Sequence, residues 1–168
     1  MITTVWMMVS VEGLNRPRRP GVTSALIVYR SHTGVTRRYG EEIARHLKTH
    51  GVEASVVSVG ECDMSMLAGT DYLFLGCWTS GMFVVMQHPD GPWLSFVRDM
   101  PKIERIAADG TARPRVALFT TYQLRTGSQF PRMRKALSGK MPSPTLELKS
   151  RNGSLSEKDR SSLNEFIA

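Results

Sequence analysis

The chain has 168 residues, enough for one domain with a single core and too few for two ordinary domains. Hydrophobic residues make up 41% and charged residues 22%, no apolar run is long enough to cross a bilayer, and two cysteines without metal-ligand spacing indicate a protein of the reducing cytoplasm. The net charge of +7 is compatible with nucleic-acid binding, but the basic residues are scattered and no aromatic-basic or helix-turn-helix motif accompanies them, so we do not expect it.

The first 23 residues are expected to form a leader outside the folded domain. Residues 1–23 lack helical or strand periodicity and end in a stretch of proline, glycine and arginine. The apolar residues 5–9 precede these arginines, which is the reverse of the order in a secretory signal. A docking arm for an acidic partner is the functional alternative to a disordered extension. The folded domain is predicted to span residues 24–168.

Strands and helices alternate through this domain. In chain order, the predicted elements are a strand at 24–30, a helix at about 35–49, a strand at 54–59, a short helix at 64–68, a strand at 72–77, a helix from Pro92, a helical stretch around 103–108, a strand at 116–121, a helix from Pro131, a strand at 145–149 and a helix from Ser156. Asp63 and Asp90 are predicted helix caps, and Ser156 with Asp159 is close to a capping box.

This alternation predicts an α/β fold of three layers, with a parallel sheet, helices on both faces and right-handed crossovers. The strand at 24–30 is apolar almost throughout, as a central strand should be, whereas the strand at 145–149 alternates polar and apolar residues, as an edge strand does. The predicted strand order is 2-1-3-4-5, although the second strand is more apolar than an edge requires. Ligands of such sheets bind beyond the carboxyl ends of the strands, where the order reverses.

A strand, a tight polar loop and a helix start follow one another at the first of these carboxyl ends. The candidate anion-binding residues are Ser31, His32, Thr33, Gly34, Val35 and Thr36. Successive backbone amides and the positive end of the helix dipole favour a phosphate there, and the hydroxyl groups add donors. The loop lacks the Lys-Ser/Thr pair of a nucleoside-triphosphate loop. A polar turn without a ligand is the alternative.

Two further loops are expected to meet the first one. Trp78 and Tyr122 come directly after the third and fourth strands, where a flat ligand can stack on them. The candidate residues of these loops are Cys77, Trp78, Thr79, Ser80 and Gly81, and Thr121, Tyr122, Gln123 and Gly127. We interpret Cys77 as a small buried hydrophobe, with a redox thiol as the alternative. The histidines show no ligand spacing, so no metal site is predicted.

The spacing S-x-T-G-x-T at Ser31–Thr36, with the two later loops, resembles the flavodoxin family over about residues 24–168. The resemblance implies that the first loop holds the phosphate of FMN and that the other two enclose the isoalloxazine between aromatic rings. Trp78 stands earlier in its loop than the aromatic ring of most flavodoxins, and Phe83 is the substitute. The fifth strand lacks the long insertion of long-chain flavodoxins, so the chain is similar to the short-chain type.

The resemblance implies an FMN-binding protein of electron transfer, but the charge of its loops is unusual. Typical flavodoxins are acidic, whereas residues 77–89 and 122–129 contain no acid and include Arg125. We therefore expect an unidentified redox partner of acidic character. An FMN-dependent oxidoreductase, such as a quinone reductase or a protoporphyrinogen oxidase, is the alternative, with the apolar residues 82–86 covering a hydrophobic substrate or packing on the core. A cofactor-free interaction module is the third hypothesis.

Overall fold

The computed structural model describes residues 21–81, 86–102 and 113–168. Within these ranges the elements are β1 (Ser24–Arg30), α1 (Val35–Thr49), β2 (Glu53–Ser58), the short 3-10 helix η1 (Met64–Leu67), β3 (Tyr72–Trp78), α2 (Gly91–Asp99), β4 (Arg115–Thr121), α4 (Gln129–Leu137), β5 (Leu146–Ser150) and α5 (Glu157–Ile167). The strands form one parallel sheet in the order β2-β1-β3-β4-β5. The predicted fold and strand order are confirmed. The proposed leader lies mostly outside the described residues, as do Phe83 and the helical stretch around 103–108.

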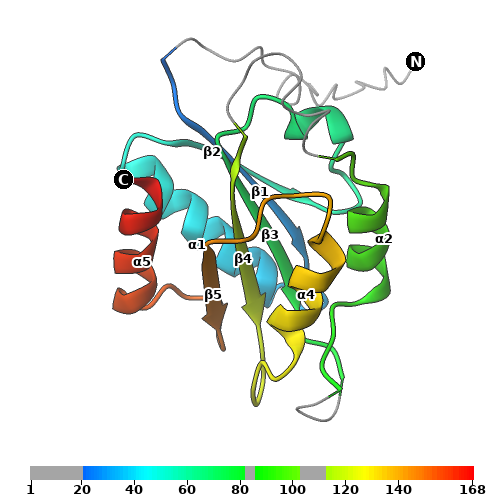
Figure 1. The fold of residues 1–168 in the computed structure, drawn as a ribbon. Coiled ribbons are helices and arrows are strands. Elements are labelled where there is room, and N and C mark those ends of the chain that lie inside the picture. Colours follow the sequence, from blue (N-terminus) through cyan, green and yellow to red (C-terminus); the bar gives the residue numbers. More distant parts are fainter. Residues whose placement is uncertain (1–20, 82–85, 103–112) are drawn as a thin grey trace, which may run out of the picture.

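The helices cover the sheet on both faces. Figure 1 shows α1 and α5 on one side of the strands, and α2 and α4 on the other. Successive side chains of a strand point to opposite faces, so β1 sends Ile27 toward α1 and α5 and sends Val28 toward α2 and α4. Both side chains are fully buried. The near-continuous apolar sequence of β1 follows from this two-sided burial.

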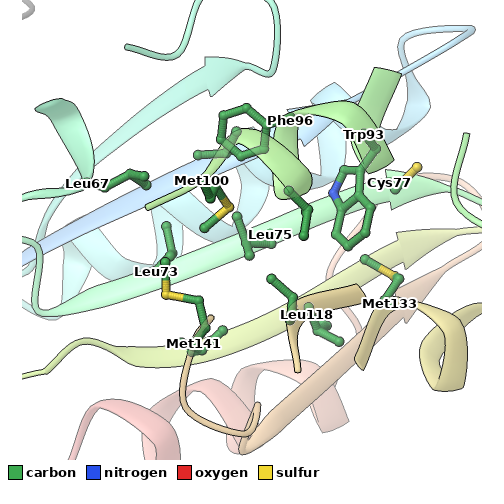
Figure 2. Packing of buried hydrophobic residues seen from close by; sticks show 14 of the residues in the cluster. Leu67, Leu73, Leu75, Cys77, Trp93, Phe96, Met100, Leu118, Met133 and Met141 are labelled. Carbon is green, nitrogen blue, oxygen red and sulfur yellow. The ribbon is translucent and has the colours of Figure 1, made fainter. Parts of the chain in front are cut away.

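The core under α2 and α4 contains large and flexible side chains. Figure 2 shows Trp93 of α2 and Met133 of α4 packed with Leu75 of β3 and Leu118 of β4. Trp93 and Met133 have no exposed surface. The cluster continues to Cys77 at the end of β3, so this core reaches the carboxyl ends of the strands, where a ligand is expected.

The other core depends on a glycine in β3. Gly76 pairs with Phe119 of β4, and a Cβ at Gly76 would stand 2.1 Å from the ring of Phe119. The missing side chain lets this ring lie across β3 and meet Tyr39 of α1 edge to face, with 6.0 Å between ring centroids. Gly76 therefore allows α1 to pack closely over the central strands, because no other residue leaves this space empty.

Local hydrogen bonds explain where the observed elements differ slightly from the predicted ones. β2 begins one residue before the predicted strand, and the Glu53 amide donates to the carbonyl of Thr23. β5 extends to Ser150, whose carbonyl accepts from the Tyr122 amide. α4 begins at Gln129 and not near Pro131, because a proline is tolerated anywhere in a first turn, where amides have no partner within the helix.

The three predicted caps are all present, and at the first of them the Asp63 carboxylate accepts from the Ser65 amide at the start of η1. The Asp90 carboxylate accepts from the Trp93 amide at the start of α2, and Ser156 and Asp159 form a reciprocal capping box at the start of α5. In the described ranges, no helix combines the length and the apolar character needed to cross a membrane.

Candidate functional site

The loops after β1, β3 and β4 meet at the carboxyl edge of the sheet around a cavity of about 650 Å³. Its described lining residues are His32, Thr33, Val35, Trp78, Thr79, Gly81, Gln87, Thr121, Tyr122, Gln123, Leu124 and Arg151. Nine of these are sequence candidates, and Gln87, Leu124 and Arg151 are not. The candidates outside this lining are Ser31, Gly34, Thr36, Cys77, Ser80 and Gly127. The volume is within the usual range for a small organic ligand.

The first loop turns the chain directly into α1. Gly34 stands at the N-cap with φ of 87°, a left-handed conformation that glycine adopts at little cost. The Ser31 hydroxyl accepts from the Gly34 amide at 3.0 Å, so Ser31 shapes the loop from within. Thr33 is exposed at the tip of the loop and lines the cavity. The first turn of α1 carries no acid, so the positive end of its dipole faces this site without a competing carboxylate.

Thr36 connects the first loop to β4. Its side chain is 1% exposed, and its hydroxyl lies 2.7 Å from the hydroxyl of Thr121. Beside this pair, the Thr120 hydroxyl donates to the Cys77 carbonyl at 2.6 Å and lies 3.1 Å from the hydroxyl of Thr79. Paired hydroxyls thus join α1, β3 and β4 below the cavity. Thr36 therefore positions the loop, and Thr33 is the hydroxyl open to a ligand.

Trp78 is fixed on one face and at its edge. The imidazole of His32 stacks on the indole with 5.2 Å between centroids and 27° between planes, and the indole N–H donates to Asp90 at 3.0 Å. A third ring does not fit between two rings at this separation. A flat ligand must therefore use the other face of Trp78 or displace His32. Tyr122 has no such ring partner among the described residues, and its side chain borders the cavity directly.

Asp90 organises the edge of the site next to Trp78. Its carboxylate accepts from Arg30 at the end of β1, at 2.7 Å, in addition to Trp78 and the cap of α2. The Cys77 thiol donates to the same carboxylate at 3.6 Å. Burial raises the pKa of Cys77 well above its usual value, so this thiol is neutral. The interpretation of Cys77 as a small buried side chain agrees with this geometry.

Arg151 is the charged residue of the lining that sequence reasoning missed. It follows β5, and its guanidinium carbon lies 6.0 Å from the centroid of the Tyr122 ring. The turn that carries it packs on α1: Arg38 donates to the Asn152 carbonyl, and a Cβ at Gly153 would stand 2.7 Å from a backbone oxygen of α1. Because β5 is parallel to the other strands, its carboxyl end lies at the same edge of the sheet. The predicted strand order could therefore have indicated Arg151 as a site residue. The expected Arg125 is exposed and does not line the cavity.

Gln87 contributes a buried amide group to the cavity wall. It is 6% exposed, and its side-chain oxygen has no hydrogen-bond donor among the described residues. The backbone here is fixed, because Ser80 and His88 exchange two hydrogen bonds and the Ser128 hydroxyl donates to the Gln87 carbonyl at 2.6 Å. A ligand with an N–H group at its edge would satisfy this acceptor. Gln87 was not a sequence candidate, because only the bridge at Ser80 brings its segment back to the cavity.

Comparison with known proteins gives a consistent result. Residues 27–152 match the family described as flavodoxin. The two-electron reduced flavodoxin of Megasphaera elsdenii is 20% identical, with a TM-score of 0.65 and coverage of 84% of this chain and 96% of that chain. Oxidised Flavodoxin 1 from Bacillus cereus is 18% identical, with a TM-score of 0.60 and coverage of 86% and 97%. The rubredoxin oxygen:oxidoreductase of Desulfovibrio gigas is 13% identical, with a TM-score of 0.60, and the match covers 85% of this chain but 34% of that one.

Proposed function

Because the chain belongs to the flavodoxin family, we propose that it binds FMN in the cavity at the carboxyl edge of the sheet and takes part in electron transfer. The observation that carries the proposal is the meeting, in one cavity, of an acid-free helix start with an exposed threonine and of two aromatic side chains from separate loops. A flavin mononucleotide has one dianionic group and one flat tricycle, which are the two parts that such a cavity can hold.

The residues of the cavity fit the two parts of FMN. Thr33 and the amides at the start of α1 would bind the phosphate, and Tyr122 would stack on the ring. The unpaired oxygen of Gln87 would accept an N–H of the ring edge. Trp78 would flank the ring, with His32 displaced if the ring occupies the face that His32 covers. When bound, FMN supplies the redox chemistry, and the chain supplies binding, orientation and the local electric field.

The partner and the location also belong to this proposal. We place the protein in a reducing cytoplasm, where Cys62 and Cys77 stay unpaired thiols, and we assign it a redox partner of acidic character. A stand-alone oxidoreductase of the same fold remains the second hypothesis. The apolar segment on which that alternative rests lies at 82–86, of which 82–85 fall outside the described residues.

The first experiment is an absorption spectrum of the purified chain, followed by titration of the flavin-free form with FMN and with riboflavin. We expect FMN to bind more tightly, and Thr33→Ala to weaken FMN alone, because a hydrogen bond to a charged group contributes about 1.5–3 kcal/mol. Tyr122→Ala should weaken both flavins, because stacking does not involve the phosphate. If Thr33→Ala lowers the affinity for FMN and for riboflavin equally, the first loop has a structural role and does not bind the phosphate.

Two outcomes would replace the proposal by its alternatives. A chain that binds neither flavin is a cofactor-free interaction module. Steady-state oxidation of NAD(P)H with a quinone as the only acceptor would identify an enzyme, because a carrier of electrons needs a second protein to turn over. Riboflavin serves as the matched control in every titration, since it differs from FMN only by the phosphate.

A further inference from the structure

A second hollow lies outside the proposed flavin cavity, between α2 and α4 on one face of the sheet. Its volume is about 560 Å³, and its described lining residues are His88, Pro89, Leu94, Arg132, Lys135 and Ala136. We call it the α2/α4 groove. Figure 1 shows these two helices side by side on the face opposite α1 and α5. Leu94 is 40% exposed at the groove, whereas Trp93 and Phe96 of the same helix are buried in the core.

The rim of the groove is positively charged. Arg132 and Lys135 are exposed and one helical turn apart on α4, and neither forms an ion pair with any described residue. The third basic residue of this helix, Arg134, is paired with Glu147 of β5 and so points to the other side. α4 contains no acid at all. Within the part of the chain that the structure describes, no carboxylate therefore neutralises the two cations beside the groove.

The groove and the flavin cavity share a wall. His88 and Pro89 line the groove, and the preceding residue, Gln87, lines the cavity. The Ser128 hydroxyl holds the Gln87 carbonyl at the start of α4, and the Asp90 carboxylate holds the start of α2. A molecule in the groove is thus separated from a ligand of the cavity by one rigid stretch of backbone.

We propose that the α2/α4 groove docks an acidic protein, with an apolar side chain of that protein against Leu94 and with its carboxylates paired to Arg132 and Lys135. The hollow accommodates a side chain, and two cations around an apolar centre complement a short acidic segment with an apolar anchor. The net charge of +7 attracts such a partner from a distance. That this partner exchanges electrons rests on the proposed function, because the shared wall brings it close to the flavin.

The test uses the full chain loaded with FMN, labelled with 15N, and a synthetic acidic peptide in which one leucine is flanked on each side by two glutamates. Two matched peptides replace the leucine by serine or all the glutamates by glutamines. We expect amide shifts at Leu94, Lys135 and Ala136 with the acidic leucine peptide, and weaker binding of both matched peptides. Shifts confined to other surfaces, or equal binding of the three peptides, would overturn the proposal.

Charge reversal distinguishes the groove from a general attraction. The double variant Arg132→Glu and Lys135→Glu should bind the acidic leucine peptide about tenfold more weakly, because two exposed ion pairs of modest strength become repulsive. Lys158→Glu with a second exposed reversal, Lys48→Glu, makes the same change of net charge on α5 and α1, on the opposite face, and should have a much smaller effect. Equal losses in the two double variants would overturn the proposal. The flavin-free chain is titrated separately with FMN and with the peptide, which separates the two hypotheses. Absence of FMN binding refutes the proposed function, and absence of peptide binding refutes the docking proposal.

Discussion

Removing one hydroxyl of the Thr36–Thr121 pair should destabilise the protein more than removing both. The hydroxyl oxygens are 2.7 Å apart, and the side chains are 1% and 5% exposed. Valine keeps the shape of threonine without the hydroxyl, so each single Thr→Val variant leaves the other hydroxyl without its partner. A buried polar group that loses its partner costs about 1–3 kcal/mol, whereas removal of both partners is nearly neutral. The double variant should therefore recover most of the loss.

The two single variants should not cost the same. Thr121 borders the cavity, where water can replace a missing partner, but Thr36 does not line it. We therefore expect Thr36→Val, which leaves the hydroxyl of Thr121 next to water, to cost about 1 kcal/mol. Thr121→Val leaves the hydroxyl of Thr36 in the interior and should cost about 2 kcal/mol or more.

Urea unfolding of the flavin-free chain at constant pH measures these differences in the four members of the cycle. Thermal unfolding should agree, with shifts of about 2–4 °C per kcal/mol for a chain of this size. The reasoning is refuted if the two single effects simply add in the double variant, because the hydroxyls would then not be coupled. Titration with FMN and riboflavin on the same variants separates stability from phosphate binding: a loss of affinity for FMN alone would give Thr36 a direct contact with the phosphate.

Three other predictions follow from particular contacts. Gly76→Ala should destabilise the protein by about 2–3 kcal/mol or prevent folding, because its Cβ would stand 2.1 Å from the Phe119 ring, and Phe119→Leu should rescue part of the loss in urea unfolding; no rescue would locate the strain elsewhere. Arg151→Gln should lower the midpoint potential of bound FMN by on the order of 50 mV, since a unit charge about 10 Å away at an effective dielectric of about 20 stabilises the reduced, anionic flavin by about 1.7 kcal/mol before screening. Arg125→Gln is the matched control, and spectroelectrochemical titration that gives equal shifts would contradict a special role for Arg151. Burial raises the pKa of Cys62 to about 11, so its alkylation, followed by peptide mass mapping, should accelerate about tenfold per pH unit between pH 8 and 10; a rate that levels off near pH 9 would mean an ordinary thiol.

The architecture was predictable because each element carries its own signal. β1 is apolar on both faces, and Glu147 and Lys149 of β5 alternate with leucines, which separates a central strand from an edge strand. The capping box at Ser156 and the cap at Asp90 depend on residues within one helical turn, which is the range over which sequence patterns are informative. The second strand was the uncertain member, and its burial pattern shows why. Ala54 packs in the core under α1, and Val57 packs in the core of the opposite face together with Leu67 of η1, so both faces of this edge strand are partly covered and it can be apolar.

The candidate site was predictable only where its residues lie in consecutive positions. The first loop and the exits of β3 and β4 are local segments, and most of their candidates line the cavity. Arg151 and Gln87 reach it through tertiary contacts, namely the packing of the turn after β5 on α1 and the bridge between Ser80 and His88. No local pattern encodes such contacts, and only the parallel direction of β5 indicated that the residue after it, Arg151, lies at this edge of the sheet. The stacking of His32 on Trp78 belongs to the same class, since it joins side chains of two loops.

The charge of the site also depends on tertiary contacts. The structure therefore separates the charges that lie near the flavin cavity from those that lie near the α2/α4 groove, which the sequence alone does not distinguish. The loops at 77–89 and 122–129 contain no acid, yet Asp90 follows immediately, and its carboxylate is paired with Arg30 and cannot act as a free negative charge. Arg151 then remains as the arginine of the described lining, while Arg132 and Lys135 belong to the α2/α4 groove. The potential of the flavin and the choice of partner should consequently depend on different arginines, so that reversal of Arg132 changes docking and leaves the potential unchanged.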